Sequence, residues 1–163
     1  MPSKSAGLLL YRTTDRILEV FLGHPGGPYY AKKDLGVWSI PKGGFETEEP
    51  LKAANREFEE ETGYMIDGNF IELNAVKSRG GKLVYAWAVE ADVDAHRITS
   101  NTFTLEFPPR SGKTQEYPEI DRAEWFAINI ARQKILAYQL PLIDELTELL
   151  QSGFQGQVTV SEL

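Results

Sequence analysis

Residues 43–64 read Gly-Gly-Phe-Glu-Thr-Glu-Glu-Pro-Leu-Lys-Ala-Ala-Asn-Arg-Glu-Phe-Glu-Glu-Glu-Thr-Gly-Tyr, and this stretch decides the fold. Pro50 suits the first turn of a helix, where its missing N–H costs nothing. The residues from Leu51 to Thr62 include many good helix formers. Gly63 stands where a left-handed C-terminal cap is wanted. The stretch therefore predicts a helix that opens after a glycine pair and closes on a glycine.

This helix has an apolar face and an acidic face. The apolar face packs on a core and comprises Leu51, Ala54 and Phe58. The acidic face comprises Glu57, Glu60 and Glu61. A solvated acidic surface is one interpretation. Glu57 and Glu61 repel each other one turn apart, and the helix dipole disfavours anions toward the C-terminus. The repulsion favours a second interpretation, a site for Mg²⁺ or Mn²⁺ that in turn holds phosphate.

The spacing of these residues resembles the Nudix box, G-x5-E-x7-R-E-U-x-E-E-x-G-U, in which U is a bulky apolar residue. Glu48, seven intervening residues and the run from Arg56 to Tyr64 fit the second part of this pattern. Tyr64 stands at an aliphatic position. Only four residues separate Gly43 from Glu48, one fewer than in the pattern, so the opening loop is expected to be one residue shorter.

The resemblance implies roles for the matched residues. Four metal ligands are implied: Glu57, Glu60, Glu61 and the Gly43 carbonyl. Arg56 would orient the catalytic carboxylates, Glu57 or another nearby glutamate would act as base, and Glu48 would orient the helix. The resemblance also implies an α/β fold, a Nudix-like α/β/α sandwich with a mixed sheet between helices. The implied reaction is hydrolysis of a diphosphate linkage in a nucleoside diphosphate derivative.

The chain as a whole suits this picture. Its 163 residues are enough for one domain, so residues 1–163 are interpreted as a single Nudix-like domain with a polar tail at 152–163. Cysteine is absent, which excludes disulfides and thiolate metal sites. With no apolar run of membrane length and no secretory leader, we expect a cytoplasmic protein. The net charge of −7 argues against a broad grip on nucleic acid but allows a small phosphorylated ligand. The oligomeric state stays open.

Hydrophobic patterns place the remaining elements around the box. Strands are predicted at residues 5–12, 17–23, 37–40, 70–77, 82–91 and 120–126, with a helix at 141–150. Pro and Gly punctuation predicts a long loop over residues 24–34, and residues 41–44 are expected to turn into the box. The stretch 99–109 is ambiguous. Strands with one early and one late helix give a mixed sheet between helices.

Basic and aromatic residues outside the helix are candidates for binding substrate: Lys42, Tyr29, Lys32, Arg110 and Lys113. Lys42 would neutralise a phosphate beside the metal, and Tyr29 would stack a base while Lys32 contacts phosphate. Arg110 and Lys113 flank Ser-Gly, which would let them reach phosphate. The alternative for each is ordinary surface charge or, for the tyrosine, packing of the loop.

One more carboxylate is expected from outside the box, as base or ligand, on the family resemblance. Glu116 is the first candidate and Glu119 the second, and the alternative is a pair of surface glutamates. His24 follows a strand and precedes Pro-Gly, so it is expected to cap a turn. Gly-Lys-Thr at 112–114 lacks the upstream glycine spacing of a P-loop.

These features predict a Mg²⁺-dependent pyrophosphohydrolase, with Mn²⁺ as a possible substitute. On resemblance to bacterial Nudix proteins near the dinucleoside polyphosphate hydrolases, the substrate is expected to be a nucleoside triphosphate or a dinucleoside polyphosphate. One alternative is an RNA 5′ pyrophosphohydrolase, which would need a basic track to the site. Another is a non-catalytic Nudix-fold module that binds nucleotides in a regulatory role.

Overall fold

The computed structural model of the chain describes residues 3–153. In this range, seven strands form one mixed sheet with the order β4-β6-β1-β2-β9, while β3 pairs with β1 and β5 pairs with β6. The strands are β1 (Lys4–Thr14), β2 (Ile17–Pro25), β3 (Lys42–Phe45), β4 (Ile71–Glu72), β5 (Val76–Lys77), β6 (Leu83–Glu90) and β9 (Ile120–Ala127). β1 runs parallel to β6, and its pairings with β2 and β3 are antiparallel.

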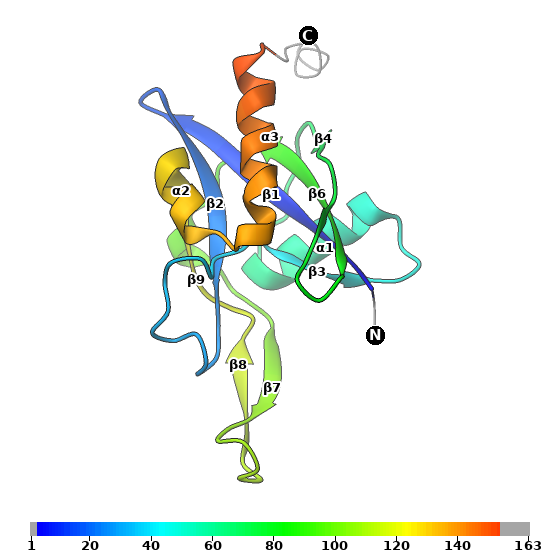
Figure 1. Cartoon of the computed structure of the whole chain (residues 1–163), viewed down its shortest axis with the longest axis vertical. Helices are drawn as coiled ribbons and strands as arrows, with labels where there is room; N and C mark the ends of the chain where they lie inside the picture. Colours follow the sequence, from blue (N-terminus) through cyan, green and yellow to red (C-terminus); the bar gives the residue numbers. More distant parts are fainter. Residues whose placement is uncertain (1–2, 154–163) are drawn as a thin grey trace.

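Helices cover both faces of this sheet (Figure 1). They are α1 (Pro50–Thr62), α2 (Ile128–Lys134) and α3 (Leu140–Gln151), with single turns η1 (Ala95–Arg97) and η2 (Ala137–Gln139). Successive side chains of a strand point to opposite faces. Accordingly, Leu8 and Leu10 of β1 pack with α1, whereas Leu9 packs with α2 and α3. The predicted α/β/α sandwich with a mixed sheet is confirmed.

The helix that the sequence predicted most sharply is α1. It spans Pro50–Thr62, with proline in the first turn and Gly63 in the left-handed conformation at φ 85°. Phe58 is fully buried on the sheet side, and its ring lies 5.6 Å from that of Phe21 on β2. The backbone N–H groups of Thr99 and Asn101 donate to carbonyls in the last turn of α1, which ties the following loop to the helix.

Several expected elements differ in the structure. Residues 37–40 form only isolated bridges, at Trp38 and Ser39, and the strand comes later as β3, where a turn was expected. The segment 70–77 contains two short strands, β4 and β5, instead of one. Helix α2 was not predicted. From residue 154 onward, the predicted polar tail at 152–163 lies outside the described residues.

A two-stranded sheet extends away from the main sheet (Figure 1). Its strands are β7 (Thr102–Glu106) and β8 (Thr114–Pro118), which pair antiparallel with each other. The loop 25–34 packs beside it, since the ring of Tyr29 lies 5.4 Å from that of Phe107. The middle of the ambiguous stretch 99–109 forms one strand of this hairpin, β7.

Among residues 3–153, no helix is both long and apolar enough to cross a membrane.

Candidate functional site

The glycine pair before α1 allows the helix to approach the sheet closely. β3 pairs with the first residues of β1, with Gly43 opposite Ala6. A Cβ atom on Gly43 would lie 1.9 Å from Oε1 of Glu57, which is closer than two non-bonded atoms can approach. The Glu57 carboxylate therefore fills the space that any other residue at position 43 would need, and it lies against the box backbone.

Arg56 connects the carboxylates of the box. Its Nη2 lies 2.7 Å from Oε1 of Glu48, and its Nη1 lies 2.8 Å from Oε2 of Glu57 and 3.0 Å from Oε2 of Glu60. These bonds raise the pKa of Arg56, and the guanidinium lowers the pKa of the partly exposed Glu48 carboxyl. Exposed ion pairs stabilise folds little. The network's main effect is geometric, because one guanidinium fixes the Glu57 and Glu60 carboxylates relative to Glu48.

Three carboxylates in this region are partly or largely removed from water. Burial raises the pKa of Glu61 to about 8, and repulsion from Glu57 and Glu119 adds to the effect. Burial likewise raises the pKa of Glu57 and of Glu119. The Lys42 ammonium opposes the shift of Glu61 and Glu119 but does not cancel it. Perturbed carboxyl groups gathered in this way are typical of functional sites.

Lys42, Glu61 and Glu119 line one pocket of about 130 Å³. Its other lining residues are Gly23, Pro25, Ser39, Ile40 and Ile120. The pocket thus joins the end of β2, the start of β3, the last turn of α1 and the residues before β9. Residues far apart in sequence meet there, with one ammonium group among carboxylates.

The side chains as they lie do not converge on a metal position. Within residues 3–153, no three His, Cys, Asp or Glu groups are gathered closely enough to hold an ion. Glu60 is bonded to Arg56 and its side chain is 41% exposed, whereas Glu57 and Glu61 are buried. The donor set nevertheless fits a hard divalent cation, since these groups offer oxygen ligands only and a cation would relieve their mutual repulsion. The Gly43 cradle around the Glu57 carboxylate fits the same purpose.

The substrate-binding candidates lie at different distances from this pocket. Lys42 lines it. Tyr29 and Lys32 are exposed in the loop that packs beside the β7–β8 hairpin. Arg110 and Lys113 lie in the connection between β7 and β8, at the tip of the hairpin, outside the pocket lining. The structure therefore brings Lys42 to the glutamates and leaves Arg110 and Lys113 apart from them.

The two candidate carboxylates outside the box lie in different places. Glu116 lies on β8 opposite Thr104 and is exposed, with Thr102 Oγ1 at 3.5 Å as its contact. Glu119 follows the end of β8 and lines the pocket. Strand pairing holds Glu116 on the hairpin, so Glu119 is the carboxylate that accompanies Glu61.

His24 and Asp121 form a contact that sequence reasoning missed. His24 is fully buried, and its Nδ1 lies 2.8 Å from Oδ1 of Asp121. His24 does more than the expected capping of a turn, because its imidazole links β2 to β9. No sequence signal joins two residues that are 97 positions apart.

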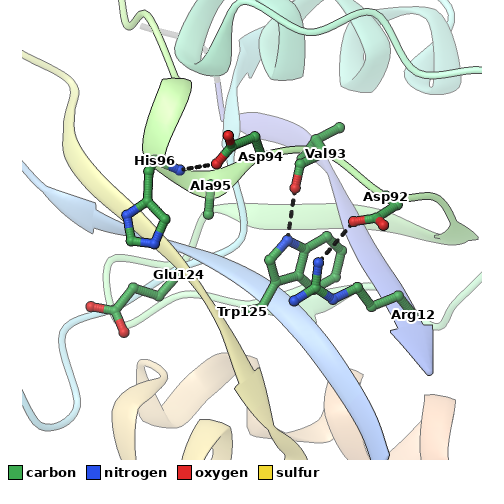
Figure 2. A pocket seen from close by; sticks show the side chains of 8 residues that line it. All are labelled: Arg12, Asp92, Val93, Asp94, Ala95, His96, Glu124 and Trp125. Carbon is green, nitrogen blue, oxygen red and sulfur yellow. Dashed lines mark hydrogen bonds and ion pairs between the residues drawn. The ribbon is translucent and has the colours of Figure 1, made fainter. Parts of the chain in front are cut away.

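A larger pocket of about 520 Å³ lies elsewhere (Figure 2). Arg12, whose guanidinium lies 4.3 Å from the Trp125 ring, lines it, but Glu19 and Asp92 already bond that guanidinium. Arg12 is five residues along β1 from Gly7, which pairs with Lys42. At about 3.3 Å per residue, roughly 17 Å separates Arg12 from the strand position that pairs with Lys42 of the smaller pocket. The box meets the larger pocket at its last residue, where the Tyr64 hydroxyl donates to the Asp94 carbonyl at 3.0 Å. The smaller pocket holds Glu61 and Glu119 beside Lys42, so we assign the site to it.

Comparison with solved structures gives the same fold. A Caenorhabditis elegans Ap4A hydrolase in a binary complex has a TM-score of 0.62 at 20% identity, covering 91% of this chain and 98% of that chain. The NUDIX domain of Shewanella oneidensis NrtR complexed with ADP ribose has a TM-score of 0.62 at 16% identity, covering 92% and 89%. A NUDIX hydrolase from Listeria monocytogenes has a TM-score of 0.65 at 18% identity, covering 91% and 94%. At such identities the likeness shows the fold alone.

A search among curated proteins found no match. A family model described as NUDIX domain matches residues 1–146. This match covers the box, the sheet and most of α3, and it supports the predicted enzyme class, a Nudix-type pyrophosphohydrolase. The chain belongs to the NUDIX family.

Proposed function

We propose that the protein hydrolyses a diphosphate linkage in a nucleoside diphosphate derivative, with Mg²⁺ as cofactor and Mn²⁺ as a possible substitute. The observation that carries this proposal is the pocket in which Glu61 and Glu119 lie beside Lys42, with the buried Glu57 close enough to help raise the pKa of Glu61. Burying carboxylates without full compensation lowers folding stability. Catalytic sites are where proteins tolerate this loss, because carboxyl groups with shifted pKa values act there in the reaction.

The metal would be held by Glu57, Glu60, Glu61 and the Gly43 carbonyl. When bound, such a cation neutralises charge on phosphate oxygens and lowers the pKa of a water. Arg56 holds the Glu57 and Glu60 carboxylates beside the box. Lys42 supplies positive charge for a phosphate at the pocket.

Glu119 is our preferred general base. A base works best when its pKa lies near the operating pH, and burial moves the pKa of Glu119 upward in that direction. Glu57 and Glu60, which the family resemblance also suggested as catalytic groups, are bonded to Arg56. This bonding suits them better to holding a cation than to taking a proton.

We further propose a nucleoside triphosphate or dinucleoside polyphosphate as substrate. The similarity to a protein named as an Ap4A hydrolase supports this choice. Tyr29 would stack a base, and Lys32 would meet phosphate. Arg110 and Lys113 at the hairpin tip would meet only a substrate long enough to reach them. We propose that residues 1–163 act as one domain in the cytoplasm.

The test compares two glutamates that are three residues apart. Purified protein is assayed for phosphate or nucleotide release across a nucleotide panel with Mg²⁺ and with Mn²⁺. Glu119→Gln should lower kcat by about 10²–10⁴-fold, the usual contribution of a general base. Glu116→Gln is the matched control and should stay within about twofold of the wild type. Equal losses in the two variants, or a loss in Glu116→Gln alone, would reject the assignment of Glu119.

The second candidate function is nucleotide binding without turnover. The structural neighbour complexed with ADP ribose favours it. No product release from any nucleotide in the panel, together with saturable binding of ADP ribose, would support this function and reject the hydrolase. The RNA alternative is disfavoured by the net charge of −7, and strongly salt-dependent binding of RNA would restore it.

A further inference from the structure

The buried imidazole of His24 faces oxygen atoms on both sides. Its Nδ1 lies 2.8 Å from Oδ1 of Asp121, and its Nε2 lies 2.7 Å from the backbone carbonyl oxygen of Lys33. The ring also packs edge-on against Trp38, with centroids 5.1 Å apart. None of the imidazole is exposed to solvent. Both ring nitrogens therefore depend on protein groups for their hydrogen bonds.

The chemistry of these partners selects one state of the ring. A carbonyl oxygen and an ionised carboxylate can only accept hydrogen bonds. A neutral imidazole has one N–H, so it can satisfy only one of the two and turns a lone pair toward the other oxygen. An imidazolium has two N–H groups and satisfies both. The geometry is therefore that of a protonated His24 beside an ionised Asp121.

The two bonds connect His24 to the segment that carries Glu119 and to the loop 26–33. Asp121 lies two residues after Glu119, and the backbone N–H of Gly26 donates to the Glu119 carbonyl at 3.1 Å. A Cβ on Gly26 would lie 1.9 Å from the carbonyl oxygen of Pro118, so the loop and the segment before β9 touch through backbone. Lys33 ends the loop 26–33, which also carries Tyr29. One ring thus ties the Glu119 segment to that loop.

We propose that His24 is a positioning residue for the proposed reaction. As an imidazolium, it holds the Glu119 segment and the loop 26–33 in the arrangement that binds substrate. A ring with only one N–H keeps only one of the two bonds, and the segment on the other side is then no longer held by His24. This inference rests on the proposed function.

Other charged groups near the ring leave Asp121 as its contacting counter-ion. Arg122, which pairs with His24 in the β2–β9 register, has its guanidinium 5.2 Å from the Trp38 ring. Asp34 accepts a hydrogen bond from Trp38 Nε1 and is paired with Lys134. The arginine disfavours a charged ring, and the bonds to Asp121 and to the Lys33 carbonyl favour it.

Asp121→Asn is the decisive variant. An asparagine amide can donate to Nδ1, so a neutral ring with its proton on Nε2 still satisfies both bonds. In the wild type, KM for diadenosine tetraphosphate with Mg²⁺ should rise about tenfold between pH 6 and pH 9, the value of one lost hydrogen bond. In Asp121→Asn this tenfold contribution should be lost, and the pH dependence that remains should come from Glu57, Glu61 and Glu119, whose pKa values are also raised. Glu124→Gln removes another β9 carboxylate that does not bond His24, so it should keep the wild-type profile.

Two histidine replacements separate the bonds. His24→Asn places an amide near the Nδ1 position and keeps the bond to Asp121. His24→Gln places one near Nε2 and keeps the bond to the Lys33 carbonyl. Each should raise KM about tenfold without the pH dependence of the wild type. A pH profile of KM that is the same in wild type and Asp121→Asn would overturn the proposal.

Nitrogen NMR of the His24 ring tests the same claim without turnover. The wild type at pH 6 should show two protonated ring nitrogens, and the ring of Asp121→Asn should show one. A neutral His24 in the wild type at pH 6 would overturn the proposal even if every variant were inactive. If the ring is charged but no nucleotide is hydrolysed, the proposed reaction fails while the bonding state of His24 stands. Binding of diadenosine tetraphosphate, measured by calorimetry, must then weaken about tenfold with rising pH, or the positioning role is rejected.

Discussion

Replacing Glu61 with glutamine should remove most of the pH dependence of stability in the metal-free protein. The pKa of Glu61 is raised from its ordinary value of 4.5 to about 8, mainly by burial. The folded state therefore holds a proton on Glu61 that the unfolded state has lost, at every pH between these values. Folded stability falls as pH rises through this window and is constant above it. A difference of about 3.5 pH units corresponds to at most about 5 kcal/mol.

The assay is urea denaturation in EDTA at pH 5 and at pH 8.5. The wild type should lose several kcal/mol of unfolding free energy between these pH values, mostly through Glu61, and Glu57 and Glu119 add to this loss because burial raises their pKa values as well. Glu61→Gln should lose much less. Glu59→Gln is the control, since Glu59 is exposed on the same helix and should behave as the wild type. Identical pH dependence in the wild type and Glu61→Gln would refute the reasoning.

Three further outcomes are expected. Gly43→Ala should lower kcat about a hundredfold in the nucleotide assay, because its Cβ must displace the Glu57 carboxylate, and an unchanged kcat would show that the close approach is dispensable. Phe58→Ala should lower the free energy of unfolding by about 3–5 kcal/mol in urea denaturation, because the ring is fully buried, and a loss below about 1 kcal/mol would contradict this packing. Mg²⁺ at about 100 times its Kd should stabilise the wild type by about 2.7 kcal/mol in calorimetry, and Glu57→Gln should gain less at the same concentration.

The sequence predicted α1 well because its signals are local. Pro50, Gly63 and the apolar spacing up to Phe58 all act within thirteen residues of helix and its cap. Helix α2 lacks such signals, since it has seven residues, no side-chain cap and only Ala131 buried. Its position is set by contacts with distant segments, such as the bond from the Trp38 amide to the Lys134 carbonyl. Single-sequence patterns do not carry that information.

The candidate site likewise has residues that local sequence patterns predict and residues whose positions depend on distant segments. The spacing of Glu57 and Glu61 could be read from the helix period, and both are buried as a pair on one side of α1. Glu116 and Glu119 stand in one polar stretch, and local patterns do not show that Glu116 lies on a paired strand while Glu119 lines the pocket. The His24 contact depends on the β2–β9 register, which local residue patterns do not specify.

The hairpin of β7 and β8 is a separable part of this molecule. Its strands pair only with each other among the described residues, and residues 107–113 join them at the far end (Figure 1). Amino acids inserted or deleted at that end leave the alignment of β1 with β3 unchanged. The length and sequence of this end of the hairpin can therefore change, in evolution or by design, while helix α1 with its glutamates stays the same.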